Sequence, residues 1–474
     1  MPLRTKIGIG FILLFLTVSA FVIRLDHASK TKITKVTIDE SVYYRLAKQL
    51  INDPLDYESI RIAEFFRKDN PNLPIPAYMT QPLFKHPPLF TYFIVMAFKL
   101  FGINTTSVSI TSCLFGVLMI PLGYLLGRLF FGEMIGLATA FFLWLDPINI
   151  ICSQKIWLDT TLNFFIVLSI YFFAYAIKYQ RDNYLLWGGL SAGLAMLTKY
   201  TGILPLVIMV LYGLIEQPEI FRNRKFWWSL VIPFMMLLPW AYWNYTVYGP
   251  SFLITHFQIE HGLGAMNIRT VLFLGFFILI GVGFIIRVLQ GKSRVTENKE
   301  LLEDAPKSSI RQGLMIGYTL LFLYVLKDSV WHSLNLTQFP PTSWQSGFFA
   351  RHPLFYFTQL TEFSFFYFLA FLSFFIVNEE RLKQAAFLYL SVVVILVFHL
   401  VWGGYQSRYV LAALPLLIIM GIVFWKELWM KFQTRDGVIR AVGQTGLVLL
   451  AGYVLLKINY LNFMVSYPND MCYF

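Results

Sequence analysis

The chain has 474 residues, of which 57% are hydrophobic and 14% are charged, and its formal net charge is +12. Soluble domains average about 25% charged residues, so this composition excludes an ordinary soluble domain and indicates a polytopic membrane protein. The apolar runs are continuous rather than alternating, which argues against a β-barrel. The basic residues fall in short runs between apolar segments, as positive-inside topology predicts, and not in a patch that would bind nucleic acid.

The apolar runs predict an all-α membrane bundle, because a helix needs about 20 apolar residues to cross the hydrocarbon core. We interpret residues 1–474 as a single membrane domain with about thirteen transmembrane helices. With the N-terminus in the cytoplasm, most basic residues between these helices fall on the cytoplasmic side. The expected helices are 7–25, 106–131, 133–151, 159–178, 184–198, 202–216, 226–245, 268–289, 312–327, 354–377, 384–402, 408–425 and 441–460.

The first extracytoplasmic loop, residues 26–105, is expected to carry two interfacial helices. Asp39 and Glu40 open the first of them, in which apolar residues recur at the spacing of an amphipathic helix on a membrane surface. Pro87-Pro88 then begins a second short helix, 89–101, because proline suits a first turn and this run is too short to span comfortably. The apolar stripe of the first helix consists of Val42, Tyr43, Leu46 and Leu50.

Two further connections stand out between the expected helices. Residues 290–312 are charged and are expected to form a cytoplasmic linker. Residues 328–353 are rich in Trp, Phe and Pro and are expected to form an extracytoplasmic loop. A loop of that length with no structure of its own commonly either binds something or is disordered.

Three acids at the extracytoplasmic side are the candidate catalytic residues. They are Asp39 and Glu40, after the first apolar segment, and Asp159, which opens the helix expected at 159–178. Ionisable groups at the mouth of a membrane bundle are expensive to keep, so they indicate a functional site. A carboxylate there can act as a general base toward a hydroxyl or an amine. Capping of a helix N-terminus is the alternative role for Asp39 and Asp159.

Four basic residues on the same side are candidates for binding a phosphate. Lys199 lies between two apolar runs, where an ammonium can either hold a phosphate or serve as a snorkelling membrane anchor. Arg269 has the same two alternatives, and Lys85 and Arg408 complete the set. The pattern therefore places positive charge beside the acids without assigning one role to each residue.

Other polar residues on this side are candidates for lining a substrate cavity. His256 and Glu260 are four residues apart and would share one face of a helix. Two ligands do not make a metal site, so a divalent metal ion stays an open alternative. The cavity candidates are His86, His256, Glu260 and His261.

Several segments resemble the glycosyltransferase-C superfamily, and the most similar branch is that of protein O-mannosyltransferases and lipid A aminoarabinose transferases. The resemblance covers about residues 5–270, and beyond Arg269 it rests on the run of helices and on Arg408-Tyr409 before Pro415. The segments, in chain order, are Asp39-Glu40, Lys85-His86-Pro87-Pro88-Leu89 with Phe101-Gly102, the run 124–132, Trp157-Leu158-Asp159, and the run 193–199 that ends in Lys199.

The resemblance implies an inverting transferase that takes a sugar from a polyprenyl phosphate, undecaprenyl or dolichyl, at the outer face of the plasma (inner) membrane. Carried over by position, Asp39 would be the general base, Asp159 would line the same cavity and Lys199 would hold the lipid phosphate. In the aminoarabinose branch a glutamate precedes Lys-Pro-Pro and helps to bind a metal ion. Lys85-His86 occupies that place here, so the metal is not carried over.

Two other classes of protein would also have many apolar helices. A secondary transporter or lipid flippase is the main alternative, but such proteins usually show two similar halves, and the sequence shows no such symmetry. A membrane scaffold or lipid sensor would not need two acids and Lys199 on one side. The acceptor of a transferase is open: lipid, glycan and protein all fit the sequence.

Overall fold

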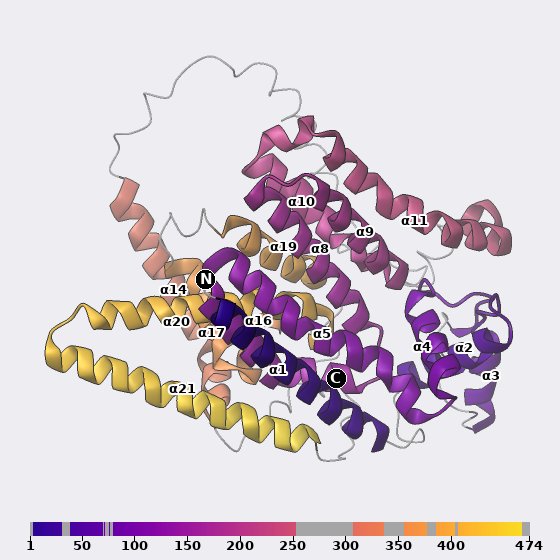
Figure 1. Ribbon diagram of the computed structural model, residues 1–474, viewed down its shortest axis with the longest axis horizontal. Helices are drawn as coiled ribbons and strands as arrows, with labels where there is room; N and C mark the ends of the chain where they lie inside the picture. Colours follow the sequence, from indigo (N-terminus) through magenta and orange to yellow (C-terminus); the bar gives the residue numbers. More distant parts are fainter. Residues whose placement is uncertain are drawn as a thin grey trace.

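The computed structural model describes residues 3–30, 38–69, 71, 75, 79–252, 307–335, 355–376, 385–402 and 406–466. Within these residues every regular element is a helix and none is a strand (Figure 1). The prediction of an all-α bundle is therefore confirmed. The expected helix 268–289 lies outside the described residues, as do His256, Glu260, His261 and Arg269.

The described helices follow the expected ones closely, although individual ends differ. Two predicted helices are wrong as single helices: 133–151 is broken into α6 and α7, and 354–377 is broken into α16 and α17. The helices α14 and α16 are separated by residues 336–354, which lie outside the described part. The bounds are α1 Leu3–Lys30, α5 Thr105–Phe131, α6 Glu133–Leu145, α7 Pro147–Gln154, α8 Asp159–Tyr179, α9 Asn183–Thr198, α10 Leu204–Ile215, α11 Arg224–Tyr248, α14 Lys307–Leu334, α16 Phe355–Phe363, α17 Phe365–Ile376, α19 Ala386–Trp402, α20 Leu414–Gln433 and α21 Gly437–Ser466.

The helix α14 changes the bounds of two expected connections. It begins at Lys307, inside the range 290–312 expected as a cytoplasmic linker. It ends at Leu334, inside the range 328–353 expected as an extracytoplasmic loop. The helix therefore overlaps the end of the first expected range and the start of the second, because it continues past its most apolar part. Most of the rest of both ranges lies outside the described residues.

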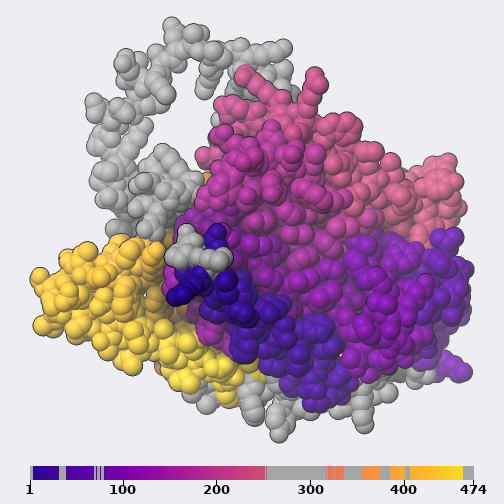
Figure 2. Space-filling model, in the orientation of Figure 1, coloured from indigo at the N-terminus to yellow at the C-terminus, as the bar shows by residue number. Residues whose placement is uncertain are grey.

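Six of the described helices are long and apolar enough to cross a membrane, or seven if the bent pair α6 and α7 is one span. They divide into an inner and an outer group. In the inner group, the buried share of the most apolar 18-residue stretch is 72% for α5, 67% for α8 and 83% for α20. In α1, α11 and α21 the share is 17%, 22% and 22%, and α21 lies along one side of the molecule (Figures 1 and 2). Apolar side chains exposed on that scale fit lipid rather than water.

The segment between α1 and α5 forms a small helical layer beside the bundle. It contains α2 Ile38–Asn52, α3 Ile60–Asp69 and α4 Leu89–Phe101, which lie together in Figure 1. The four apolar side chains of the predicted stripe of α2 are buried within the protein, and α4 has the predicted bounds. The position of these helices at the membrane surface stays a prediction. The helix α3 was not predicted. The layer packs on the end of α11 through Tyr57, whose ring lies 6.0 Å from that of Trp240.

The break between α6 and α7 bends the chain by 54° inside the bundle. Asp146 caps α7 by accepting a hydrogen bond from Asn149 N at 2.8 Å. The buried guanidinium of Arg24, on α1, donates to the free carbonyls of Leu143 and Trp144 at 3.3 and 3.1 Å. It also donates to Gly116 O and Ser153 Oγ. Since unpaired backbone groups are costly in a membrane, these bonds stabilise the break. The chain then continues from α7 into the short segment before Asp159.

Candidate active site

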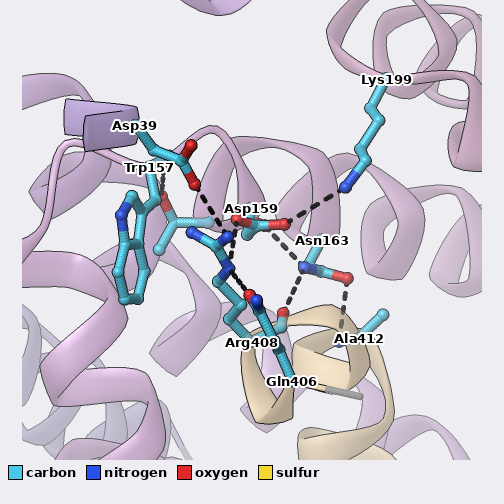
Figure 3. Close-up of polar contacts among 9 residues, drawn as sticks. Asp39, Trp157, Asp159, Asn163, Lys199, Gln406, Arg408 and Ala412 are labelled. Carbon is cyan, nitrogen blue, oxygen red and sulfur yellow. Dashed lines mark hydrogen bonds and ion pairs between the residues drawn. The ribbon is translucent and has the colours of Figure 1, made fainter. Parts of the chain in front are cut away.

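Four charged side chains meet where α2, α8, α9 and the turn before α20 come together (Figure 3). The guanidinium of Arg408 lies between two acids: its Nη2 is 2.9 Å from Asp39 Oδ2, and its Nε is 3.7 Å from Asp159 Oδ2. On the other side of Asp159, Oδ1 is 3.9 Å from Lys199 Nζ. The charges therefore alternate along the cluster: Asp39, Arg408, Asp159, Lys199.

Each of these residues is positioned by the end of a helix. Asp39 lies in the first turn of α2, and Asp159 lies in the first turn of α8. Lys199 has extended backbone between α9 and the 3-10 turn η3, Tyr200–Ile203. Arg408 belongs to the 3-10 turn η6, Ser407–Ala413, which leads into α20. Helix termini thus bring side chains from distant parts of the sequence to one side of the bundle.

Arg408 is fixed from several directions. Its Nε donates to Gln406 Oε1 at 2.5 Å, and its guanidinium lies 4.4 Å from the centre of the Trp157 ring. Asn163, one turn into α8, ties the η6 turn to that helix by donating to Arg408 O and accepting from Ala412 N at 3.1 Å. Stacking on an aromatic face and a planar set of donors suit arginine and not lysine.

Asp39 and Glu40 are adjacent in the sequence but have different environments. The side chain of Asp39 is 39% exposed, whereas that of Glu40 is 3% exposed. Glu40 accepts a hydrogen bond from Ile156 N at 3.1 Å and lies 3.9 Å from Lys155 Nζ. Glu40 therefore holds the segment that carries Trp157 and Asp159, while Asp39 is accessible from outside.

Asp159 is the most buried acid of the charged cluster, with 5% of its side chain exposed. Its Oδ1 has no hydrogen-bond partner among the described residues. The distance of 3.9 Å to Lys199 Nζ is too long for a hydrogen bond. A buried carboxylate is costly unless it is paired, so Asp159 depends on the two cations beside it.

Lys199 is 18% exposed, and its ammonium lies 4.4 Å from the centre of the Tyr409 ring. The turn that carries it is tight, since a Cβ at Gly202 would lie 2.2 Å from Ala195 C. The next residue, Tyr200, accepts a hydrogen bond from Trp240 Nε1 at 2.8 Å. The same indole packs on Tyr57, so Trp240 links the Lys199 turn to the layer that carries Asp39.

Lys85 and His86 lie in the loop layer, on the segment before α4. His86 is buried, and its ring lies 5.6 Å from that of Phe84, which in turn packs edge-on against Tyr43 at 5.7 Å. Lys85 beside it is half-buried. Burial, and secondarily the nearby Asp39 carboxylate, raise the pKa of the Tyr43 phenol well above its ordinary value, so this side chain stays protonated.

Sequence reasoning missed several residues of this site. Trp157 was seen only as part of a motif, and Asn163 and Gln406 were not considered. The signals available were weak: an amide four residues after Asp159, and a polar Gln406-Ser407 pair before Arg408 at the start of an apolar run. His399 was also missed; its ring stacks 6.1 Å from that of Tyr409.

A metal ion was the open alternative for this side of the protein. The described residues contain no group of three or more His, Cys, Asp and Glu side chains that could hold one. The two acids that would be its natural ligands are instead occupied by the guanidinium of Arg408. The part of this site that the structure describes therefore does not fit a metal centre, while His256 and Glu260, which raised this alternative, lie outside the described residues.

Part of this chain is similar in sequence to known proteins. Residues 85–243 match the family described as dolichyl-phosphate-mannose-protein mannosyltransferase. An uncharacterised protein of Aquifex aeolicus is 28% identical over 182 residues, which are 38% of this chain and 36% of that relative. The match thus spans about a third of the relative's length.

Three solved structures are similar in fold. The apo structure of ArnT from Cupriavidus metallidurans aligns with 97% of this chain and 76% of its own, at 16% identity and a TM-score of 0.53. The same protein bound to undecaprenyl phosphate aligns with 96% and 76%, at 14% identity and a TM-score of 0.50. The Archaeoglobus fulgidus oligosaccharyltransferase complex with Zn and sulfate aligns with 95% of this chain and 53% of its own, at 15% identity and a TM-score of 0.55. Together with the family match, these likenesses show that this chain is a membrane protein with the glycosyltransferase-C fold.

Proposed function

We propose that this chain is an integral membrane glycosyltransferase that moves a sugar from a polyprenyl-phosphate donor to an acceptor, with inversion at the anomeric carbon. The observation that carries the proposal is the cluster in which Arg408 lies between Asp39 and Asp159, with Lys199 beyond. This reaction needs a base for the acceptor and positive charge for a phosphate leaving group. The cluster supplies both.

The roles follow from exposure and distance. Asp39, the exposed acid, takes the proton from the acceptor hydroxyl or amine as that atom bonds to the anomeric carbon. The bond from that carbon to the phosphate oxygen breaks, and the polyprenyl phosphate leaves with the electron pair. Lys199 and Arg408 stabilise the negative charge that develops on this phosphate. Asp159, buried between these two cations, orients them.

The remaining candidates extend this proposal. Lys85 and Arg269 are further candidates for the donor phosphate, and Glu40 supports the segment that carries Asp159. The proposed lining of the substrate cavity is His86, His256, Glu260 and His261. In one of the similar structures, ArnT is bound to undecaprenyl phosphate, which supports a polyprenyl donor here.

We place the site at the extracytoplasmic face of the plasma membrane. The support is the charge at the far ends of the helices that carry the cluster. There, Arg128 pairs with Glu133 at 2.9 Å, Lys178 donates to Leu129 O, and Lys225 donates to Asn183 Oδ1 at 2.7 Å. Basic residues at short connections favour the cytoplasmic side, so the Asp39 end faces outward.

The test is a transfer assay in membranes that contain this chain, with a panel of labelled undecaprenyl- and dolichyl-phosphate sugars. The expected result is movement of label from one donor to an acceptor, with release of the polyprenyl phosphate, and loss of that transfer in Asp39→Asn. Movement of an intact donor between leaflets, with no cleavage of its phosphate bond, would instead support the flippase alternative and refute the transferase.

A further inference from the structure

The guanidinium of Arg408 lies where a divalent metal ion could otherwise bind, between two carboxylates. Asp39 belongs to α2 and Asp159 to α8. In each acid, Oδ2 is the oxygen nearest to Arg408. A guanidinium keeps its positive charge in a protein because it is a very strong base. The two carboxylates are therefore neutralised by a group that is covalently part of the chain.

This guanidinium is built into the fold and is not a mobile surface charge. The side chain is 10% exposed and stacks on the ring of Trp157. Its Nε donates a hydrogen bond to Gln406 Oε1. Its backbone is tied to α8 through Asn163. A side chain held in this way cannot leave the position without the loss of several contacts.

The other charges near Asp159 also disfavour a divalent ion. Lys199 lies on its second side, and the third nearby acid, Glu40, is committed to the backbone of Ile156 and to Lys155. A divalent ion between the carboxylates would meet two like charges, Arg408 and Lys199. It would also lack a third anionic ligand within the part of the chain that the structure describes.

We propose that Arg408 replaces a divalent cation in this site. Fixed side chains then neutralise the charge of the acids and of the phosphate leaving group, and transfer needs no metal ion. The contrast is with the similar oligosaccharyltransferase, whose structure is a complex with Zn. A consequence follows for variants: removal of the guanidinium alone would leave Asp39 and Asp159 unneutralised and would create a site for a divalent ion.

The first measurement is metal binding by the purified full chain in detergent, after an EDTA wash. Free Mn²⁺ is followed by electron paramagnetic resonance during a titration. Wild-type protein is expected to bind no more Mn²⁺ than an Asp39→Asn, Asp159→Asn double variant, which reports adventitious binding. Arg408→Ala is expected to bind Mn²⁺ at least about tenfold more tightly than wild type, because two carboxylates lose their cation.

Matched variants make this gain specific. Arg408→Lys keeps a positive charge and should show no gained site. Arg408→Ala combined with Asp39→Asn should lose the gain. If Arg408→Ala does not yield folded protein, Arg408→Gln removes the same charge and retains a polar side chain of similar length. A gain in none of the charge-removing variants would overturn the proposal.

The second measurement is metal content and metal dependence. Elemental analysis of wild-type protein should find no stoichiometric metal after the EDTA wash, and transfer should be unchanged by EDTA. Stoichiometric metal that survives the wash would refute the inference, as would transfer that is lost with EDTA and restored by Mn²⁺, Mg²⁺ or Zn²⁺. Only the transfer measurement rests on the proposed function. If the predicted pattern of metal binding holds but no donor is used, the transferase proposal fails, while the replacement of a divalent cation by Arg408 stands without its consequence for transfer.

Discussion

Two buried arginines, Arg24 and Arg408, lie in polar regions of different kinds. Arg24 is 2% exposed, and its guanidinium donates hydrogen bonds to neutral acceptors: the carbonyls of Gly116, Leu143 and Trp144, and the hydroxyl of Ser153. Arg408 is 10% exposed and faces two carboxylates, one of which is open to the outside. Both arginines are fixed, but the second belongs to a network of charged side chains that is partly exposed.

The difference shows how a polar group inside a membrane bundle can be assigned a role. Around Arg24, the break between α6 and α7 is closed by donors from four elements, including Tyr367 Oη, which bonds to Asp146 Oδ2 at 2.5 Å, and Asn462, which bonds to Leu145 O. A buried oxygen without a hydrogen-bond partner among the described residues occurs in each region, on Asn462 Oδ1 near Arg24 and on Asp159 Oδ1 near Arg408. The difference is that the unpaired atom near Arg408 is a carboxylate oxygen between two cations and close to the partly exposed Asp39, which marks a site that binds something.

The largest effect is expected from Arg24→Ala. The substitution leaves the carbonyls of Leu143 and Trp144 unpaired inside the bundle, at about 1–3 kcal/mol for each buried group, and removes the cation near Asp146. Loss of folded protein is expected, as measured by size-exclusion chromatography and thermal unfolding in detergent. The matched control is Arg408→Ala, which should remain folded while transfer is lost. Normal yield and melting temperature in Arg24→Ala would break the comparison.

Asp39→Asn should lower transfer by roughly two to four orders of magnitude, because it removes a general base and keeps the shape of the side chain. Folding should survive, since the carboxylate is partly exposed. The rate is measured with saturating donor in the transfer assay. Glu40→Gln is the adjacent control: its effect should be on stability, through the Ile156 contact. If Glu40→Gln abolished transfer and Asp39→Asn did not, the role of base would belong to Glu40.

Lys199→Ala should weaken use of the donor by about 1.5–3 kcal/mol, the value of a hydrogen bond to a charged group. The phosphate loses one cation, but Arg408 remains. The dependence of the initial rate on donor concentration measures this change, and Lys199→Arg should restore part of it. A wild-type donor dependence in Lys199→Ala, at normal expression, would reduce Lys199 to a membrane anchor.

The smallest effect is expected from Trp157. Trp157→Leu removes the ring beneath Arg408 and should cost about 0.5–2 kcal/mol of cation–π attraction, seen as a several-fold loss of transfer per folded protein. Because Trp157 is only 2% exposed, the cavity that is left should also lower the melting temperature. Trp157→Phe keeps an aromatic face and should lie between this variant and wild type. Equal activity of all three proteins would show that Gln406 and Asn163 alone suffice to hold Arg408.

Much of the fold could be predicted because it depends on patterns within short segments. An apolar run of sufficient length forms a membrane helix whatever lies elsewhere, so the positions of α1, α5, α8 and α21 follow from composition. The stripe of α2 and the Pro87-Pro88 start of α4 are equally local. The break after α6 was missed although Asp146-Pro147 signalled it, because the apolar letters continue across it and the groups that stabilise it lie on α1, α17 and α21.

The candidate site shows where such prediction ends. The gathering of acids and cations at helix ends on one side could be predicted from the sequence, because the positive-inside pattern and the polar residues between apolar runs are local signals. The position of Arg408 between Asp39 and Asp159 could not be predicted, since these residues are brought together by helix packing across most of the chain. Packing also distinguishes Asp39 from Glu40: successive residues on a helix point about 100° apart, and packing against residues 155–156 buries one and leaves the other exposed.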